Sequence, residues 1–225
     1  MGRSILQSIQ IAAGAGFLLF CVFPVAASSA EGSLAAFQRE FDRVRSFAGR
    51  FRQEFYDALL ERRSLSEGTV LFKRPGLMRW SYQKPDRMLI VIGSEKIWIY
   101  DPDLENVTIQ NVDDVKKLDS LSFLFKSESL DLHFEEVAPT TLFLDASAET
   151  AQLYLKPKKP HQNLAELQIA LDDRTRRIKQ FVVVDAQQSF RKITFADLNY
   201  SVEIDSSQFH FVPTEGMEII EETLY

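Results

Sequence analysis

Cysteine is almost absent from this sequence. The only one in 225 residues is Cys21, which lies in an apolar segment near the start of the chain. Arg3 precedes that segment and small residues follow it, which is the order typical of a cleavable export signal. We therefore expect residues 1–30 to be a signal peptide and residues 31–225 to form one exported domain. Without Cys21, that domain has no disulfide, no thiolate metal site and no cysteine nucleophile.

An excess of positive charge is also missing. The chain has 26 lysines and arginines against 32 aspartates and glutamates, so its formal net charge is -6 at pH 7, and removal of Arg3 with the signal would make it -7. No basic run is interleaved with aromatic residues, as binding to phosphates and stacked bases requires. We expect no nucleic-acid partner and no lasting attraction to an anionic membrane. After the signal, no apolar run reaches the roughly 20 residues of a membrane-spanning helix.

Motifs of catalysis are absent as well. No serine lies in a nucleophile elbow, and no glycine-rich phosphate loop follows a predicted strand. The histidines His133, His161 and His210 are far apart and have no neighbour at metal-ligand spacing, so we interpret them as solvated or core residues. Asp101 and Asp103 indicate a turn, because the glycine and distant glutamate of a calcium loop are missing. We expect neither an enzyme nor a bound cofactor or metal.

Helical periodicity is present in two segments. Between residues 34 and 47, apolar side chains recur at three- and four-residue steps after Ser33, which can cap a helix. The same period returns at 115–125, where Asp113 and Asp114 suit the positive end of a helix dipole. Both segments predict amphipathic helices.

Strand periodicity covers most of the remaining chain. From Gly49 to Tyr56 apolar and polar residues alternate, and turn signals containing proline, glycine or aspartate separate the alternating segments that follow. Further strands are predicted at 65–73, 77–83, 88–92, 97–100, 105–111, 132–137, 151–155, 164–171, 178–184, 190–200 and 209–212. The short spacing between them is typical of antiparallel hairpins.

These elements must bury all their apolar faces together. We expect a mainly β fold with an α lid, namely an open, incomplete antiparallel β-barrel of about eleven strands covered by two or three helices. Helices that cover the concave side of a curved sheet leave a cavity between the two layers, and a ligand would bind there.

Large apolar side chains that share one parity of several strands, or one face of a helix, are the candidate cavity residues. They are Phe37, Phe41, Phe51, Phe55, Met78, Trp80, Tyr82, Ile90, Leu121, Leu124 and Phe125. Alternation of this kind also describes a packed core, because every half-buried sheet shows it. Large flexible and aromatic side chains equally suit an adaptable pocket, so both interpretations stay open.

Two motifs carry a family resemblance. Residues 74–80 have the sequence RPGLMRW, and residues 97–102 have the sequence IWIYDP after a further turn at Pro85. Their order and spacing resemble the LolA family of periplasmic lipoprotein carriers, and a weaker resemblance extends over the rest of the exported chain. The chain departs from the family where Gly93 replaces the usual Asp-Gly turn, and where many members have a proline before the helix that contains Leu121.

The resemblance implies a periplasmic carrier whose apolar cavity takes the acyl chains of lipoproteins. The implied partners are acylated lipoproteins as cargo, an inner-membrane lipoprotein-releasing ABC transporter and an outer-membrane lipoprotein receptor. The family arginine before the proline hydrogen-bonds the lid helices in the closed state, so the resemblance implies that Arg74 is a lid latch. From its own surroundings in the sequence, without the resemblance, Arg74 is better interpreted as a solvated turn residue. We expect a monomer.

Three other functions compete with lipoprotein transport. A periplasmic binder of another lipid, such as a phospholipid or a lipid-linked sugar, could use the same scaffold. A sensor domain that works by protein contact is a second alternative, although no further segment for a partner is visible. A lipid hydrolase is the third, and the missing nucleophile motif counts against it. Identification of co-purified material would separate these functions.

Overall fold

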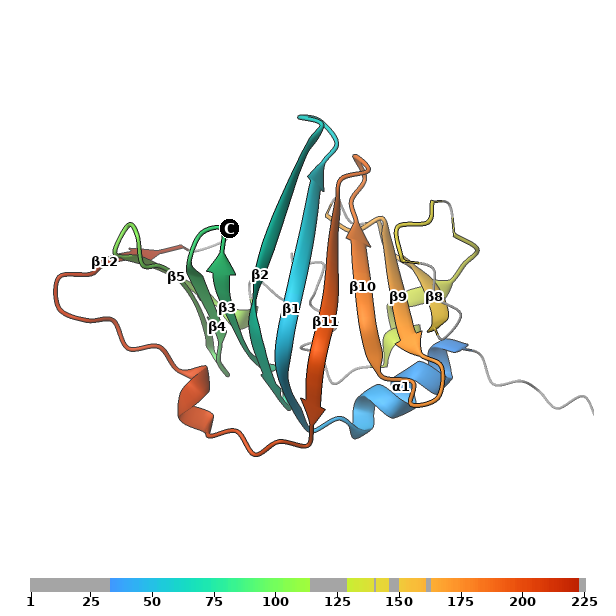
Figure 1. Ribbon diagram of the computed structural model, residues 1–225, viewed down its shortest axis with the longest axis horizontal. Coiled ribbons are helices and arrows are strands. Elements are labelled where there is room, and N and C mark those ends of the chain that lie inside the picture. Colours follow the sequence, from blue (N-terminus) through green and yellow to red (C-terminus); the bar gives the residue numbers. More distant parts are fainter. Residues whose placement is uncertain (1–32, 114–128, 140, 146–149, 161–162, 223–225) are drawn as a thin grey trace, which may run out of the picture. The chain divides into compact units, whose positions relative to one another are not determined.

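The computed structural model describes residues 33–113, 129–139, 141–145, 150–160 and 163–222. These residues form one α-helix, two short 3-10 helices and a single twelve-stranded sheet (Figure 1). The strands are β1 (Ser46–Asp57), β2 (Arg62–Lys73), β3 (Leu77–Lys84), β4 (Met88–Ile92), β5 (Lys96–Asp101), β6 (Asn106–Asn111), β7 (Phe134–Glu136), β8 (Thr150–Pro157), β9 (Glu166–Asp172), β10 (Ile178–Val184), β11 (Phe190–Tyr200) and β12 (Glu218–Glu221). The helices are α1 (Ser33–Arg43), η2 (Leu130–Leu132) and η3 (Ser206–Phe209).

The sheet is open. Its strand order is β12-β6-β5-β4-β3-β2-β1-β11-β10-β9-β8-β7, so β12 and β7 are edges that do not pair with each other. All neighbouring strands are antiparallel except β12, which runs parallel to β6. The long strand β1 lies at the centre and pairs with both β2 and β11, which joins the two halves of the sequence. The expected mainly β, incomplete barrel is confirmed, with twelve strands in place of about eleven.

Helix α1 covers one face of this sheet, which we call the inner face. Leu34, Phe37 and Phe41 recur at three- and four-residue steps on the helix and are all buried. At its start, the Ser33 hydroxyl donates to the Glu136 carboxylate of edge strand β7, and the Leu34 N–H donates to the same group at 3.3 Å. A carboxylate there satisfies free N–H groups and suits the helix dipole.

The first helix ends earlier than its periodicity in the sequence predicted. The helix ends at Arg43 and β1 begins at Ser46, so Phe47 belongs to the strand. Phe47 lies opposite Phe72 of β2 and Tyr200 of β11 in the ladder, and pairing with two strands overrides its helical spacing from Phe41. The predicted second lid helix, with Leu121, Leu124 and Phe125, lies outside the described residues, as does the expected signal peptide.

One prediction near the chain's C-terminal end was wrong, and one strand there was missed. Residues 209–212 form no strand, because Phe209 ends the 3-10 helix η3 and the residues after it do not join the sheet. Strand β12 was not predicted, because all four of its residues are exposed and show no alternation. Its parallel pairing with β6 depends on how the chain returns to the sheet, which local periodicity does not encode.

Candidate functional site

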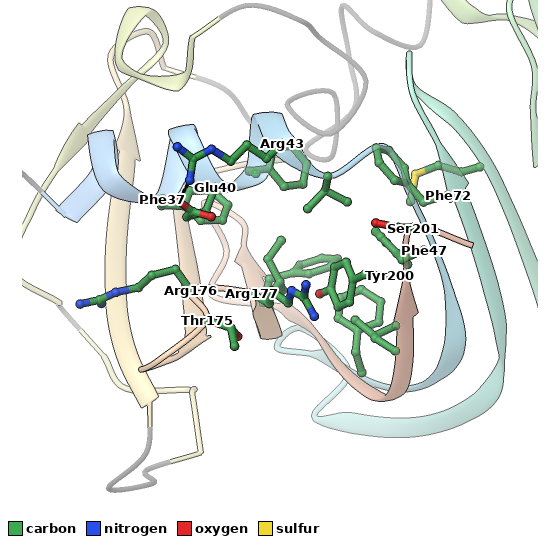
Figure 2. A pocket seen from close by; sticks show the side chains of 17 residues that line it. Phe37, Glu40, Arg43, Phe47, Phe72, Thr175, Arg176, Arg177, Tyr200 and Ser201 are labelled. Carbon is green, nitrogen blue, oxygen red and sulfur yellow. Dashed lines mark hydrogen bonds and ion pairs between the residues drawn. The ribbon is translucent and has the colours of Figure 1, made fainter. Parts of the chain in front are cut away.

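An apolar cavity of about 110 Å³ lies between α1 and the inner face of the sheet (Figure 2). Its walls come from α1, from strands β1, β2, β3, β10 and β11, and from the turn between β9 and β10. The lining residues are Phe37, Glu40, Phe41, Arg43, Val44, Phe47, Phe72, Met78, Thr175, Arg176, Arg177, Ile178, Phe181, Phe195, Leu198, Tyr200 and Ser201. Segments far apart in the sequence therefore build one hollow beneath the helix.

Aromatic rings join the helix to the sheet along this cavity. The ring centroids of Phe37 and Phe41 are 5.5 Å apart, and those of Phe41 and Phe72 are 6.3 Å apart. Phe72 stacks in turn on Phe47 at 5.0 Å. Because ring contacts are apolar and weakly directional, rings of this kind can contact a hydrocarbon chain in place of each other.

Polar side chains gather at one side of the cavity. We define the mouth of the cavity by these residues, which are Glu40, Arg43, Arg176, Arg177 and Tyr200. Figure 2 shows Glu40 and Arg43 on the helix side, and Arg177 beside Tyr200 on the sheet side. Burial raises the pKa of the Tyr200 phenol to about 12, so this group is neutral at physiological pH. The site thus has an apolar interior and a charged mouth.

Arg74 binds the C-terminal end of α1. Its Nε donates to the Val44 carbonyl at 2.9 Å, and its Nη2 donates to the Phe41 carbonyl at 2.8 Å. The same Nη2 lies 3.2 Å from the Asp42 carboxylate, and the guanidinium lies 5.0 Å from the centre of the Phe41 ring. The last carbonyls of a helix have no partner within it, and a cation there suits the helix dipole. Arg74 therefore connects the β2–β3 turn to the helix.

The predicted cavity residues fall into four groups. Phe37, Phe41 and Met78 line the cavity. Phe51, Trp80, Tyr82 and Ile90 lie in the same apolar cluster but not on the cavity wall. Phe55 is half-buried near the far end of β1, where the Arg191 guanidinium lies 6.0 Å from its ring centre. Leu121, Leu124 and Phe125 lie outside the described residues.

The second group is closely packed beside the cavity. The Phe51 ring lies 4.9 Å from the Trp80 ring and 5.0 Å from the Tyr82 ring, measured between centroids, in edge-to-face geometry. The Tyr82 hydroxyl donates to Gln53 Oε1 at 3.0 Å, and burial raises the pKa of that phenol. This polar pair satisfies the hydroxyl inside an apolar region.

The sequence interpretation missed several lining residues. Phe72, Phe181 and Phe195 share strand parity with other buried residues, and extending the parity argument to β2, β10 and β11 would have found them. The mouth residues Arg176 and Arg177 follow the Asp172-Asp173 turn and carry no periodic signal. Only the fold brings that turn to the end of helix α1.

The residues that the structure describes contain no group of three or more histidine, cysteine, aspartate or glutamate side chains placed to hold a metal ion. Within the same residues, no helix is long and apolar enough to cross a membrane.

An open antiparallel sheet with a helix held over an apolar cavity defines the architectural class of this protein. The family model described as outer membrane lipoprotein carrier protein LolA matches residues 42–212, and the chain belongs to that family. An outer-membrane lipoprotein carrier protein of Pseudomonas aeruginosa is 29% identical over 181 residues, which cover 80% of this chain and 84% of the relative. One of Bordetella pertussis is 28% identical over 221 residues, covering 96% and 99% of the two chains.

A solved structure shows the same fold at low sequence identity. An uncharacterized conserved protein from Thermus thermophilus superposes with a TM-score of 0.54 at 12% identity. The superposition covers 85% of this chain and 100% of the Thermus chain. This likeness supports the open sheet with its covering helix.

Proposed function

We propose that this protein carries the acyl chains of lipoproteins through the periplasm, from an inner-membrane ABC transporter to an outer-membrane receptor. The observation that carries the proposal is the cavity beneath α1, in a chain of the lipoprotein carrier family. Residues 1–30 would direct export and then be cleaved, and the protein would act by binding, as a monomer, without catalysis.

The size of the cavity indicates that α1 must move for loading. An apolar cavity of about 150 Å³ admits one benzene molecule, so about 110 Å³ accommodates only a few carbon atoms. Each methylene exposed to water costs about 0.8 kcal/mol, so three chains of about sixteen carbons would cost on the order of 35 kcal/mol unshielded. We therefore interpret the described state as the empty, closed carrier.

The contacts of α1 suit a helix that opens and closes. Its polar bonds include those to Glu136 at the start and to Arg74 at the finish. Between them, Gln38 Oε1 accepts from the Leu130 N–H at 2.9 Å. Each such bond contributes only about 0.5 to 3 kcal/mol, which is small beside the burial of acyl chains. In the proposed loaded state the helix moves away, and the chains contact Phe37, Phe41 and the neighbouring apolar cluster, together with the predicted residues Leu121, Leu124 and Phe125.

Arg74 is the proposed latch in this cycle. With its bonds to Phe41 and Val44 formed, the closed state competes with the loaded one, so that cargo can be released. Direction would come from a receptor that holds the acyl chains more strongly than the carrier does. Because each latch bond contributes only about 0.5 to 3 kcal/mol, loading and release of cargo are reversible in principle.

Mass spectrometry of the lipid that co-purifies with the periplasmic protein tests the proposed cargo. We expect triacylated lipoprotein on the native chain and its loss in Ile178→Trp, which places a large ring in the cavity. The matched control is Ile109→Trp, because Ile109 is also half-buried but packs on the opposite face of the sheet. Phospholipid or lipid-linked sugar in place of lipoprotein would reject the proposed cargo. Equal amounts of cargo on both variants would reject the cavity under α1 as the binding site.

A further inference from the structure

The mouth of the cavity has the opposite charge to the protein as a whole. Among the residues that line the cavity, Arg43, Arg176 and Arg177 are basic and only Glu40 is acidic. The whole chain has a formal net charge of -6. A positively charged mouth above an apolar interior matches the two parts of an anionic amphiphile.

Two of these three arginines are already engaged. Arg43 forms an ion pair with Glu40 one helical turn away. Arg176 lies 4.0 Å from the Asp173 carboxylate, and Figure 2 shows its side chain directed away from the cavity. The charges of Arg43 and Arg176 are therefore already paired with carboxylates of the protein, so neither arginine is the first candidate for binding a ligand.

Arg177 is placed differently. Its guanidinium lies 4.2 Å from the centre of the Tyr200 ring, and Figure 2 shows both side chains facing the cavity. In the part of the chain that the structure describes, no carboxylate forms an ion pair with Arg177. The nearby Asp172 carboxylate instead accepts from the Thr175 N–H at 2.8 Å and pairs with Lys179 at 3.2 Å.

Stacking on Tyr200 suits Arg177 to anion recognition. An aromatic ring covers one flat side of the guanidinium and leaves its N–H edge open. That edge presents parallel donors that match the two oxygens of a carboxylate or phosphate. The tail of a ligand bound in this way would begin at the mouth and continue toward Phe181 and Phe195 in the cavity wall.

We propose that Arg177 recognises the anionic head of a long-chain amphiphile whose tail occupies the cavity under α1. This inference rests on the proposed acyl-chain binding at the same site. It adds a second class of ligand with a negatively charged head, beside the lipoprotein, whose acylated cysteine carries no charge. The head could be the carboxylate of a free fatty acid or the phosphate of a lipid, because both present the oxygen pair that a guanidinium binds.

Binding of three twelve-carbon ligands to the full exported chain tests this proposal. Laurate carries a carboxylate, dodecyl phosphate carries a phosphate, and dodecanol is a neutral control with the same tail. At low salt we expect the anions to bind about three- to tenfold more tightly than dodecanol, as for a partly exposed charge-assisted contact. The stronger of the two anions identifies the head group, and high salt should reduce the preference.

The Arg177→Gln variant assigns the preference to this side chain. We expect it to bring the affinities for laurate and dodecyl phosphate to within about twofold of the dodecanol affinity measured on the same variant. Arg174→Gln is the matched control, because Arg174 is exposed on the same turn but does not line the cavity. An unchanged anion preference in Arg177→Gln, or none in the native chain, would overturn the proposal while leaving acyl binding intact. If none of the three ligands binds, the proposed acyl site fails as well.

Discussion

The inner and outer faces of the sheet bury apolar residues of the same strands but are covered in different ways. On β10, Phe181 and Val183 belong to the inner cluster, whereas Val182 and Val184 belong to a cluster on the outer face. The outer cluster is covered by residues 141–145, which include Phe143 and Leu144. Alternation is therefore the same on both faces, and the covering segment decides whether a face is closed or can open.

The outer covering is bonded along its length. Gln168 accepts from the Phe143 N–H at 3.1 Å and donates to the Thr141 carbonyl at 2.6 Å. Gln180 accepts from the Asp145 N–H at 2.9 Å and donates to its carboxylate at 2.8 Å. These buried amides hold the segment as a neighbouring strand would. Helix α1 instead covers the cavity with the apolar side chains of Phe37 and Phe41, besides its bonds to Glu136, Leu130 and Arg74. We expect the outer segment to stay in place while α1 moves.

The largest effect that this comparison predicts is a loss of stability in the Gln168→Leu variant. The Gln168 side chain is fully buried at 0% exposure, and its loss leaves the Phe143 N–H and the Thr141 carbonyl without partners. A buried group left unpaired costs about 1 to 3 kcal/mol, whereas the carbonyl of the exposed Thr141 can bind water. We therefore expect the free energy of unfolding to fall by about 1 to 3 kcal/mol. Urea denaturation measures this loss.

Lipid affinity should stay unchanged in the same variant, because the substitution lies on the outer face. Gln187→Leu is the control, since Gln187 is exposed in the β10–β11 turn and its replacement should change stability by less than about 0.5 kcal/mol. A loss of lipid binding in folded Gln168→Leu would show that the two faces are not independent.

A smaller effect is expected on the inner face, from Arg74→Leu. This change removes both bonds to the carbonyls at the end of α1 and the pair with Asp42, which weakens the closed state by about 1 to 2 kcal/mol. We expect the folded variant to retain acyl ligand about five- to thirtyfold more strongly and to hand over cargo poorly. Loaded carrier would then accumulate in the periplasm, which can be measured by fractionation and fluorescent fatty-acid release.

Two substitutions separate a latch from a general effect of charge. Arg74→Lys keeps the charge but cannot reach both carbonyls with a planar group, so it should show part of the defect. Arg79→Leu is the matched control, because Arg79 donates to the Gln208 carbonyl at 3.0 Å and does not contact α1. Normal cargo delivery by Arg74→Leu would remove Arg74 from the latch role.

The fold could be predicted from the sequence wherever alternation was bounded by clear turns. The predicted bounds of β4, β10 and β11 agree with the structure residue for residue, because each strand has apolar alternation or a buried run between turn signals. Phe47 was assigned to the helix because it follows Val44 by three residues, as Val44 follows Phe41. Pairing with β2 and β11 decides that assignment, and such pairing is not a local property of the sequence.

The candidate site was only partly predictable, because parity gives the face of a strand and not the position along it. Met78 and Trp80 share one face of β3, yet only Met78 lines the cavity. Trp80 lies two residues further along, where it packs on Phe51. The position of α1 over the inner face sets this difference, and the interactions at the helix ends come from Glu136 and Arg74, far apart in sequence.

The smallest predicted effect uses pH to distinguish the two coverings. Donation from Gln180 and then from Lys192 to the Asp145 carboxylate lowers its pKa below the ordinary value of about 3.9. Since folding favours the charged carboxylate, its stabilising contribution is present above the ordinary pKa and is lost as the pH falls through the lowered value. Acid should therefore loosen the outer segment more than the C-terminal end of α1, which Arg74 holds through the main-chain carbonyls of Phe41 and Val44.

Hydrogen exchange on residues 141–145 and on α1, compared at pH 6 and pH 3 after correction for intrinsic rates, measures this difference. We expect exchange protection of the outer segment to fall in acid more than that of α1 in the native chain. In Asp145→Asn, this extra loss should shrink, because the amide carries no charge to titrate. The side chain of Asp145 is 69% exposed, so solvent screens its interactions and the effect is smaller than that of either substitution above. Equal pH dependence in the native chain and in Asp145→Asn would mean that Asp145 does not hold the outer segment through its charge.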